Sequence, residues 1–190
     1  MKNIAHCTVS FFLLLWLIQP VQAQDAYNAL KSRAGGLRSS FSANFALTTS
    51  GGMVRSGKLY YQAPNKLHVK MSGGGVIATN GRQLVIYNPG SVVAAKQDVG
   101  GASGGLFSTL RSYTGSIRGN SYVFTKPGAY YEEIVVTVRG KMIASVRMRH
   151  EDQVQTFSFS NVKVGRGIKA SLFSFRPPTS VRIIENPMNR

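Results

Sequence analysis

The sequence is poor in cysteine, tryptophan and acidic residues. Its 190 residues include one Cys, one Trp and seven Asp plus Glu, against 23 Lys plus Arg. A single cysteine cannot form an intramolecular disulfide, and the chain has neither a Cys/His cluster nor carboxylates at metal-ligand spacing. These absences argue against a disulfide scaffold and against a metal site.

Long apolar runs are also missing. The longest, Val9 to Ile18, is shorter than the roughly 20 residues that a membrane-spanning helix needs. Lys2 precedes it, and Val21 and Ala23 occupy the −3 and −1 positions of a cleavage site. Residues 1–23 are therefore predicted to be a secretory signal peptide cleaved after Ala23, with a retained membrane anchor as the alternative. Cys7 precedes the apolar run, so it is not a lipid-modified cysteine at the cleavage point.

The predicted mature chain, residues 24–190, has no cysteine and a formal charge of +15, from 22 basic and seven acidic residues. Its length suits a single domain that buries roughly 70% of the surface of the unfolded chain. The basic residues are scattered and often alternate with apolar ones, as in Arg147-Met148-Arg149. Alternation predicts a solvated basic strand face. Attraction to an anionic partner or membrane surface is the alternative, and nucleic-acid binding is not favoured.

Catalytic motifs are nearly absent. Gly101-Ala102-Ser103-Gly104-Gly105 matches the G-x-S-x-G pattern of hydrolases, and Glu132 or Glu133 followed by His150 would complete the order of a triad. The parallel α/β context of that motif is missing, so the run is interpreted as a glycine-rich linker. No phosphate loop or dinucleotide fingerprint is present. We therefore expect a binding protein that is not an enzyme and uses no cofactor.

The amino-terminal part of the mature chain has helical periodicity. Apolar residues recur at spacings of three and four from Leu30 through Leu37 to Phe45, which predicts a helix over 25–45. Gly35-Gly36 interrupts it, so we expect a break there and the first strand near Phe41. Another short helix is expected from Leu106 to Tyr113.

Elsewhere the apolar period is close to two, and Asn80-Gly81 is a strong hairpin signal. About ten strands in antiparallel succession are predicted. The expected fold is mainly β (α+β), with a strongly curved antiparallel sheet forming a partial or complete barrel that helices cover. The expected strands are 58–61, 66–71, 76–79, 84–87, 92–96, 121–125, 132–138, 142–150, 154–162 and 171–176.

Several motifs resemble those of the LolA family of periplasmic lipoprotein carriers, over nearly all of residues 25–185. The most specific is the strand–turn–strand of 76–89, which ends in Tyr87-Asn88-Pro89. The opening helix at 25–33, the strand and turn at 57–67 and the closing Phe173-Ser174-Phe175-Arg176-Pro177-Pro178 also match, in the same order.

The resemblance implies an unclosed antiparallel β-barrel with a helical lid. The implied function is that of a periplasmic chaperone that binds the acyl chains of lipoproteins released from the inner membrane and delivers them to the outer membrane. Implied partners are acylated lipoproteins, an inner-membrane lipoprotein-releasing ABC transporter, and an outer-membrane lipoprotein receptor or the outer membrane itself. A monomer is expected.

Alternation selects candidate acyl-chain-binding residues on one face of each strand, but it does not say which face is concave. On the helices they are Leu30, Leu37, Phe41, Leu106 and Leu110; on the sheet they are Leu59, Leu67, Val69, Met71, Leu84 and Ile86. Ala63 stands where the family has an arginine that helps to hold the lid closed, which predicts a looser lid or a latch supplied from elsewhere in the chain. Alternative functions are a carrier or sensor of a phospholipid or glycolipid on the same fold, or a module that binds anionic surfaces.

Overall fold

The computed structural model describes residues 23–35, 39–99, 108–165 and 167–187. Their strands form one sheet of twelve, in the spatial order β12-β6-β5-β4-β3-β2-β1-β11-β10-β9-β8-β7. The bounds are β1 (Ser40–Thr49), β2 (Val54–Gln62), β3 (Lys66–Met71), β4 (Val76–Thr79), β5 (Gln83–Tyr87), β6 (Val93–Asp98), β7 (Thr114–Arg118), β8 (Ser121–Thr125), β9 (Glu133–Arg139), β10 (Met142–His150), β11 (Gln153–Val164) and β12 (Arg182–Glu185).

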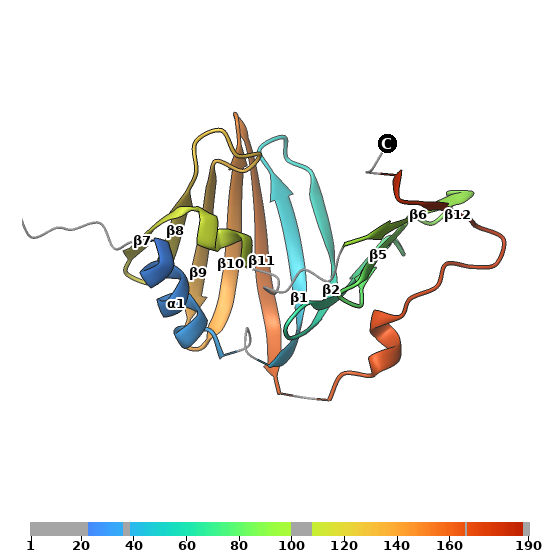
Figure 1. Cartoon of the computed structure of the whole chain (residues 1–190), viewed down its shortest axis with the longest axis horizontal. Coiled ribbons are helices and arrows are strands. Elements are labelled where there is room, and N and C mark those ends of the chain that lie inside the picture. Colours follow the sequence, from blue (N-terminus) through green and yellow to red (C-terminus); the bar gives the residue numbers. More distant parts are fainter. Residues whose placement is uncertain (1–22, 36–38, 100–107, 166, 188–190) are drawn as a thin grey trace, which may run out of the picture.

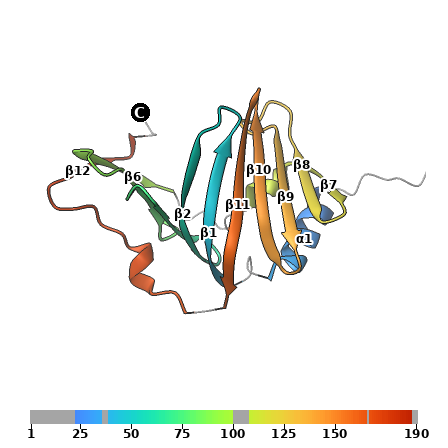
Figure 2. The ribbon, with the colours of Figure 1, turned by 180° about the vertical axis from the view of Figure 1, so that it is seen from behind.

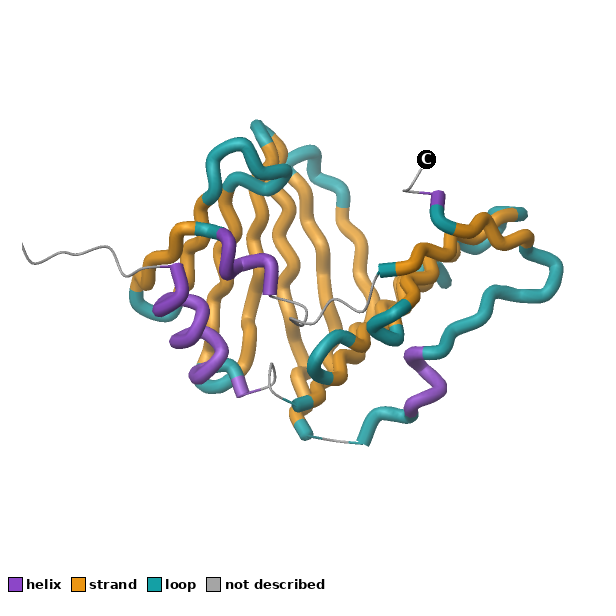
Figure 3. Tube along the Cα trace, viewed as in Figure 1, coloured by secondary structure: helices purple, strands orange, loops and turns teal. Residues whose placement is uncertain are grey.

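The sheet curves without closing, because its edge strands β7 and β12 stand at opposite ends of the order. The helix α1 (Ala23–Arg33) and the 3-10 helix η2 (Ser108–Ser112) lie on the concave side (Figure 1, Figure 3). Seen from behind, the strands from β2 to β9 present their convex side (Figure 2). The predicted mainly β fold, an unclosed curved sheet under a helical cover, is confirmed.

The helix α1 joins the sheet through one apolar stripe. Tyr27, Leu30 and Ala34 are buried, at the spacings of three and four that place them on one side. Asp25 lies in the first turn, and Lys31 and Arg33 lie in the last turn. The negative charge at the start and the positive charges at the end both interact favourably with the helix dipole. The stripe packs in a buried core cluster with residues of η2 and of β8 to β10, namely Leu110, Tyr122, Phe124, Ile134, Val136, Val138, Ile143 and Val146.

The predicted interruption after α1 and the start of the first strand near Phe41 are confirmed, but the extension of the helical pattern to Phe41 and Phe45 is wrong. Both residues lie in β1, where Phe41, Ala43 and Phe45 are buried at a period of two. Spacings of four satisfy a strand as well as a helix, which explains the error. These three residues form a second core cluster with Leu59, Tyr61 and Val69.

The last predicted strand, 171–176, is also wrong. Residues Ala170–Phe173 form the 3-10 helix η3. Phe173 is buried, and the ring of Phe175 lies 6.2 Å from that of His68 and 6.1 Å from that of Tyr87. The alternating phenylalanines thus lie over the strands around β3 and β5 instead of extending a sheet edge.

The prediction also missed β7 and β12, and β12 pairs with β6 in parallel, not antiparallel as expected. The short helix expected at Leu106–Tyr113 is a 3-10 helix over its described part. The bounds of β3, β4, β8 and β10 match the prediction. At the predicted hairpin, Gly81 has a φ of 92°, and the side-chain oxygen of Asn80 accepts the N–H groups of Arg82 and Gln83.

Candidate functional site

An apolar surface extends along the concave side from β1 to β5. Leu59 pairs with Val69, Val69 with Ile77 and Ile77 with Ile86. Directly paired residues lie on the same face of a sheet. The same reasoning joins Tyr61, Leu67, Thr79 and Leu84 in one row and Gly57 with Met71 in another. The six predicted sheet residues, Leu59, Leu67, Val69, Met71, Leu84 and Ile86, therefore share one face.

That face is the one covered by the helices. Phe45 pairs with both Gly57 and Phe159, and Phe159 packs against the cluster that contains α1. The face is apolar and continuous from β8 to β5, but helices cover only one of its two ends. Under α1 and η2, Leu30 and Leu110 are 0% and 2% exposed. On β3 to β5, Leu67, Leu84 and Ile86 are only half-buried.

The predicted helical residues fall into two groups. Leu30 and Leu110 are part of the closed core under the cover, so they would reach a ligand only if α1 and η2 moved. Phe41 lies in β1, where its ring is 5.3 Å from that of Tyr61. Leu37 and Leu106 lie outside the described residues. The role of each of these residues toward a ligand stays a prediction.

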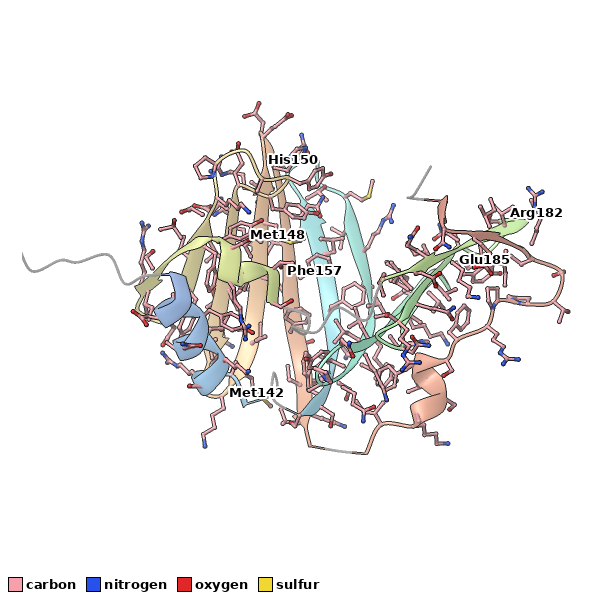
Figure 4. The ribbon with its side chains drawn as sticks, in the orientation of Figure 1. Met142, Met148, His150, Phe157, Arg182 and Glu185 are labelled. Carbon is pink, nitrogen blue, oxygen red and sulfur yellow. The ribbon has the colours of Figure 1, made fainter. Side chains whose placement is uncertain are left out.

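Sequence reasoning left several residues of the apolar face out of the candidate set. Met148 and Phe157 lie on the concave side of β10 and β11, beside η2 (Figure 4). The ring of Phe157 is 6.1 Å from that of Phe45. Ile77 continues the face on β4. The alternation of β11 was the available signal, because Phe157 and Phe159 are two residues apart.

Ala63, the predicted lid-latch position, lies just after β2 and packs against the second core cluster. Its N–H donates to the carbonyl oxygen of Ser39, at 2.6 Å. Ser39 leads into β1, so Ala63 anchors the start of that strand through its backbone. The effect of the missing arginine on the lid stays a prediction.

The acidic residues and the histidine of the candidate triad have other partners. An oxygen of Glu132 lies 3.3 Å from a guanidinium nitrogen of Arg149, and one of Glu133 lies 3.0 Å from a nitrogen of Arg147. His150 stacks on Tyr130, with 4.0 Å between ring centroids. Ser103 lies outside the described residues. Within those residues there is no group of three His, Cys, Asp or Glu side chains that could hold a metal ion, and no helix suited to crossing a membrane.

No protein-family model matches the sequence, and no curated protein matches it either. Solved structures are similar to it in fold. An uncharacterized conserved protein from Thermus thermophilus has a TM-score of 0.59 at 10% identity, over 86% of this chain and 98% of that one. A LolA superfamily protein from Nitrosomonas europaea has a TM-score of 0.45 at 12% identity, over 80% and 97% of the two chains.

A putative outer membrane lipoprotein-sorting protein domain from Vibrio parahaemolyticus has a TM-score of 0.46 at 9% identity, over 80% of this chain and 95% of that one. These comparisons concern the fold. The chain has a LolA-like fold, because its open curved sheet and its concave helical cover are the architecture that its sequence motifs predict. Its function has to be argued from its own residues.

Proposed function

We propose that this protein is a periplasmic carrier that binds the acyl chains of lipoproteins and delivers them to the outer membrane. One observation carries the proposal: the continuous apolar face that runs from the closed core under α1 to the half-buried residues of β3 to β5. A face of this kind, on the concave side of an open sheet, can enclose a flexible hydrocarbon chain.

The energetics of an acyl chain in water explain why such a face is needed. Each CH₂ group kept out of water contributes about 0.8 kcal/mol, so a free acylated protein would not leave its membrane. Leu67, Met71 and Ile86 supply half-buried apolar surface at the open end of the face. Movement of α1 and η2 would add Leu30 and Leu110 to that surface.

In this proposal residues 1–23 direct export and are removed, and residues 24–190 act as a single monomeric domain. The protein receives lipoproteins from an inner-membrane lipoprotein-releasing ABC transporter and passes them to an outer-membrane receptor or to the outer membrane itself. The resemblance of the motifs supports these partners. The apolar face supports the chemistry of the cargo.

The test is a release assay. Residues 24–190 are added to spheroplasts that hold an acylated lipoprotein and a compatible transporter, and the soluble fraction is analysed for a complex. Release of lipoprotein as a soluble complex is expected, and would show that loading does not require an arginine in place of Ala63. The absence of release by a folded protein would contradict the proposal. Mass spectrometry of lipid that copurifies would then identify a phospholipid or glycolipid cargo.

A further inference from the structure

A hollow of about 440 Å³ lies where β3 ends beside β2. The ladder between these strands runs from Gly57 to Gln62 on β2, and beyond it the N–H of Ser72 donates to the carbonyl oxygen of Ser56, at 2.8 Å. The hollow is therefore a notch formed where β3 stops and β2 continues. Its lining residues are Asn44, Phe45, Ser56, Gly57, Lys58, Lys70, Met71 and Ser72.

Two positive charges meet at this notch. Lys58 and Lys70 are paired directly across the ladder, and both are exposed. Opposed residues have Cβ atoms about 5 Å apart, and like charges placed so are destabilising. The ion pairs found among the described residues belong to Lys96, Arg147 and Arg149, so neither lysine has a carboxylate there.

The neighbours on the same strand face do not neutralise the lysines. Asn44 pairs with Lys58 on one side, and Val76 pairs with Lys70 on the other. The closest aromatic contact is that of the Lys58 ammonium with the Tyr60 ring, at 5.6 Å from its centroid. An anion held between the two ammonium groups would remove the repulsion between them.

Neutral donors complete the notch. The hydroxyl oxygens of Ser56 and Ser72 are 2.9 Å apart and share one hydrogen bond. Since each hydroxyl has one hydrogen, the pair keeps one O–H to donate outward. The amide of Asn44 adds N–H donors. Two ammonium groups, a hydroxyl and an amide suit an anion with several acceptor oxygens and more than one negative charge.

We propose that this notch binds a phosphate group. The chemistry is common to free phosphate and to the phosphate of a lipid headgroup. Phe45 and Met71 also line the notch and belong to the apolar face, whereas Lys58 and Lys70 occupy the alternate strand positions and lie on the other face of the sheet. The notch site is argued from its own charges and does not rest on the carrier function.

The first test is a titration of residues 24–190 with inorganic phosphate, in which NMR measures the amide chemical shifts. Saturable shifts are expected at Ser56, Gly57 and Ser72. Lys58→Gln or Lys70→Gln should weaken binding about tenfold, the loss of one charge-assisted hydrogen bond. Lys141→Gln is the matched control, because Lys141 is an exposed lysine at the β9–β10 turn. Shifts spread over the basic surface, or equal weakening in the control, would overturn the site.

The second test identifies the source of the phosphate. Each variant is mixed with phosphatidylcholine vesicles, with and without phosphatidylglycerol. If Lys58→Gln and Lys70→Gln weaken binding to the anionic vesicles more than Lys141→Gln does, the ligand is a lipid headgroup. If only the phosphate titration separates the variants, the ligand is free phosphate. If neither measurement separates them, the proposal is wrong.

Discussion

At the scale of single residues, the open end of the apolar face offers the clearest test of the carrier function. Leu67 and Ile86 are half-buried there, so glutamate at either position keeps contact with water and the protein should still fold. A carboxylate on this face would have to lose its water to accept an acyl chain. Leu67→Glu or Ile86→Glu should therefore abolish binding of a fluorescent fatty-acyl probe.

Ile183→Glu is the control for this prediction. Ile183 is 44% exposed on β12 and pairs with Ala94, which lies on the opposite face from Ala95 and Ile86. Circular dichroism would establish that all three variants are folded. Probe binding by folded Leu67→Glu and Ile86→Glu at the level of Ile183→Glu would rule out this face as the acyl site.

His68 should make stability depend on pH. It is 6% exposed, and its Nδ1 lies 2.6 Å from the carbonyl oxygen of Leu172, so Nδ1–H donates. Burial lowers the pKa of His68 from its ordinary 6.5, the hydrogen bond to Leu172 opposes this, and the charge of Lys70 lowers the pKa further. The folded protein thus binds this proton more weakly than the unfolded chain does.

The contribution of His68 to the free energy of unfolding is therefore complete above about pH 6.5 and is lost as the pH falls toward the lowered pKa of the folded state. Urea unfolding at pH 7.5 and pH 5.0 measures the loss. His68→Phe should show a smaller loss over the same interval, because the other titrating groups are unchanged. An equal loss of unfolding free energy in both proteins would mean that groups other than His68 cause the pH dependence.

At the scale of elements, the close packing of β1, β2 and β3 depends on a glycine. A Cβ atom added to Gly57 would meet the carbonyl oxygen of Lys70 and would lie 2.9 Å from both the Met71 Cα and a ring carbon of Phe45. Gly57→Ala should lower the free energy of unfolding by roughly 1–3 kcal/mol, as overpacking does. Chemical denaturation would measure the change.

Gly73 provides the comparison, since a Cβ there meets nothing within 4 Å. Gly73→Ala should change the free energy of unfolding by less than about 0.5 kcal/mol. Equal effects of the two substitutions would mean that β2 and β3 adjust to the added methyl group.

Elements were predictable where sequence period and turn chemistry agreed. β3 has alternating apolar residues, β4 is a short apolar run, and Asn80-Gly81 fixes the hairpin between β4 and β5. β12 was missed because its four residues are mostly exposed, so they carry no periodic apolar signal. Phe173 and Phe175 led to the wrong prediction of a strand, because phenylalanines at alternate positions also occur in a segment that packs over a sheet without joining it.

The candidate site was predictable up to the choice of face. Alternation within each strand from β2 to β5 sorts the apolar residues onto one of its two faces. The register between the strands then places Leu59, Val69 and Ile86 on the same surface. The depth of the cover was not predictable, since burial of Leu30 and Leu110 depends on how α1 sits against β7 and β8. Contacts between distant segments have no local signature.

At the scale of the whole molecule, the excess of basic residues and the apolar face should respond differently to salt. The full chain carries a formal charge of +16. At 1 M salt the screening length for interactions between exposed charges is about 3 Å, whereas burial of hydrocarbon does not depend on that screening. Association with anionic vesicles should therefore fall between about 50 mM and 1 M NaCl, while binding of a neutral acyl probe should persist.

Sedimentation with vesicles and probe fluorescence measure the two quantities on one sample of residues 24–190. Vesicles of pure phosphatidylcholine serve as the uncharged control. Loss of acyl-probe binding in step with vesicle binding would favour a module that recognises anionic surfaces and has no acyl site.

The pairing of β1 with β11 has a consequence for how the chain matures. Phe45 is joined to Phe159 and Leu47 to Phe157, so the centre of the sheet unites segments more than 100 residues apart. Closing so long a loop is slow, and proteins dominated by such pairings fold late compared with those built from local contacts. β1 can pair early with the adjacent β2, but its pairing with β11 has to wait until nearly the whole polypeptide is made. For the export proposed above, this delay is useful, because a chain that has not yet folded can still be threaded through a narrow channel.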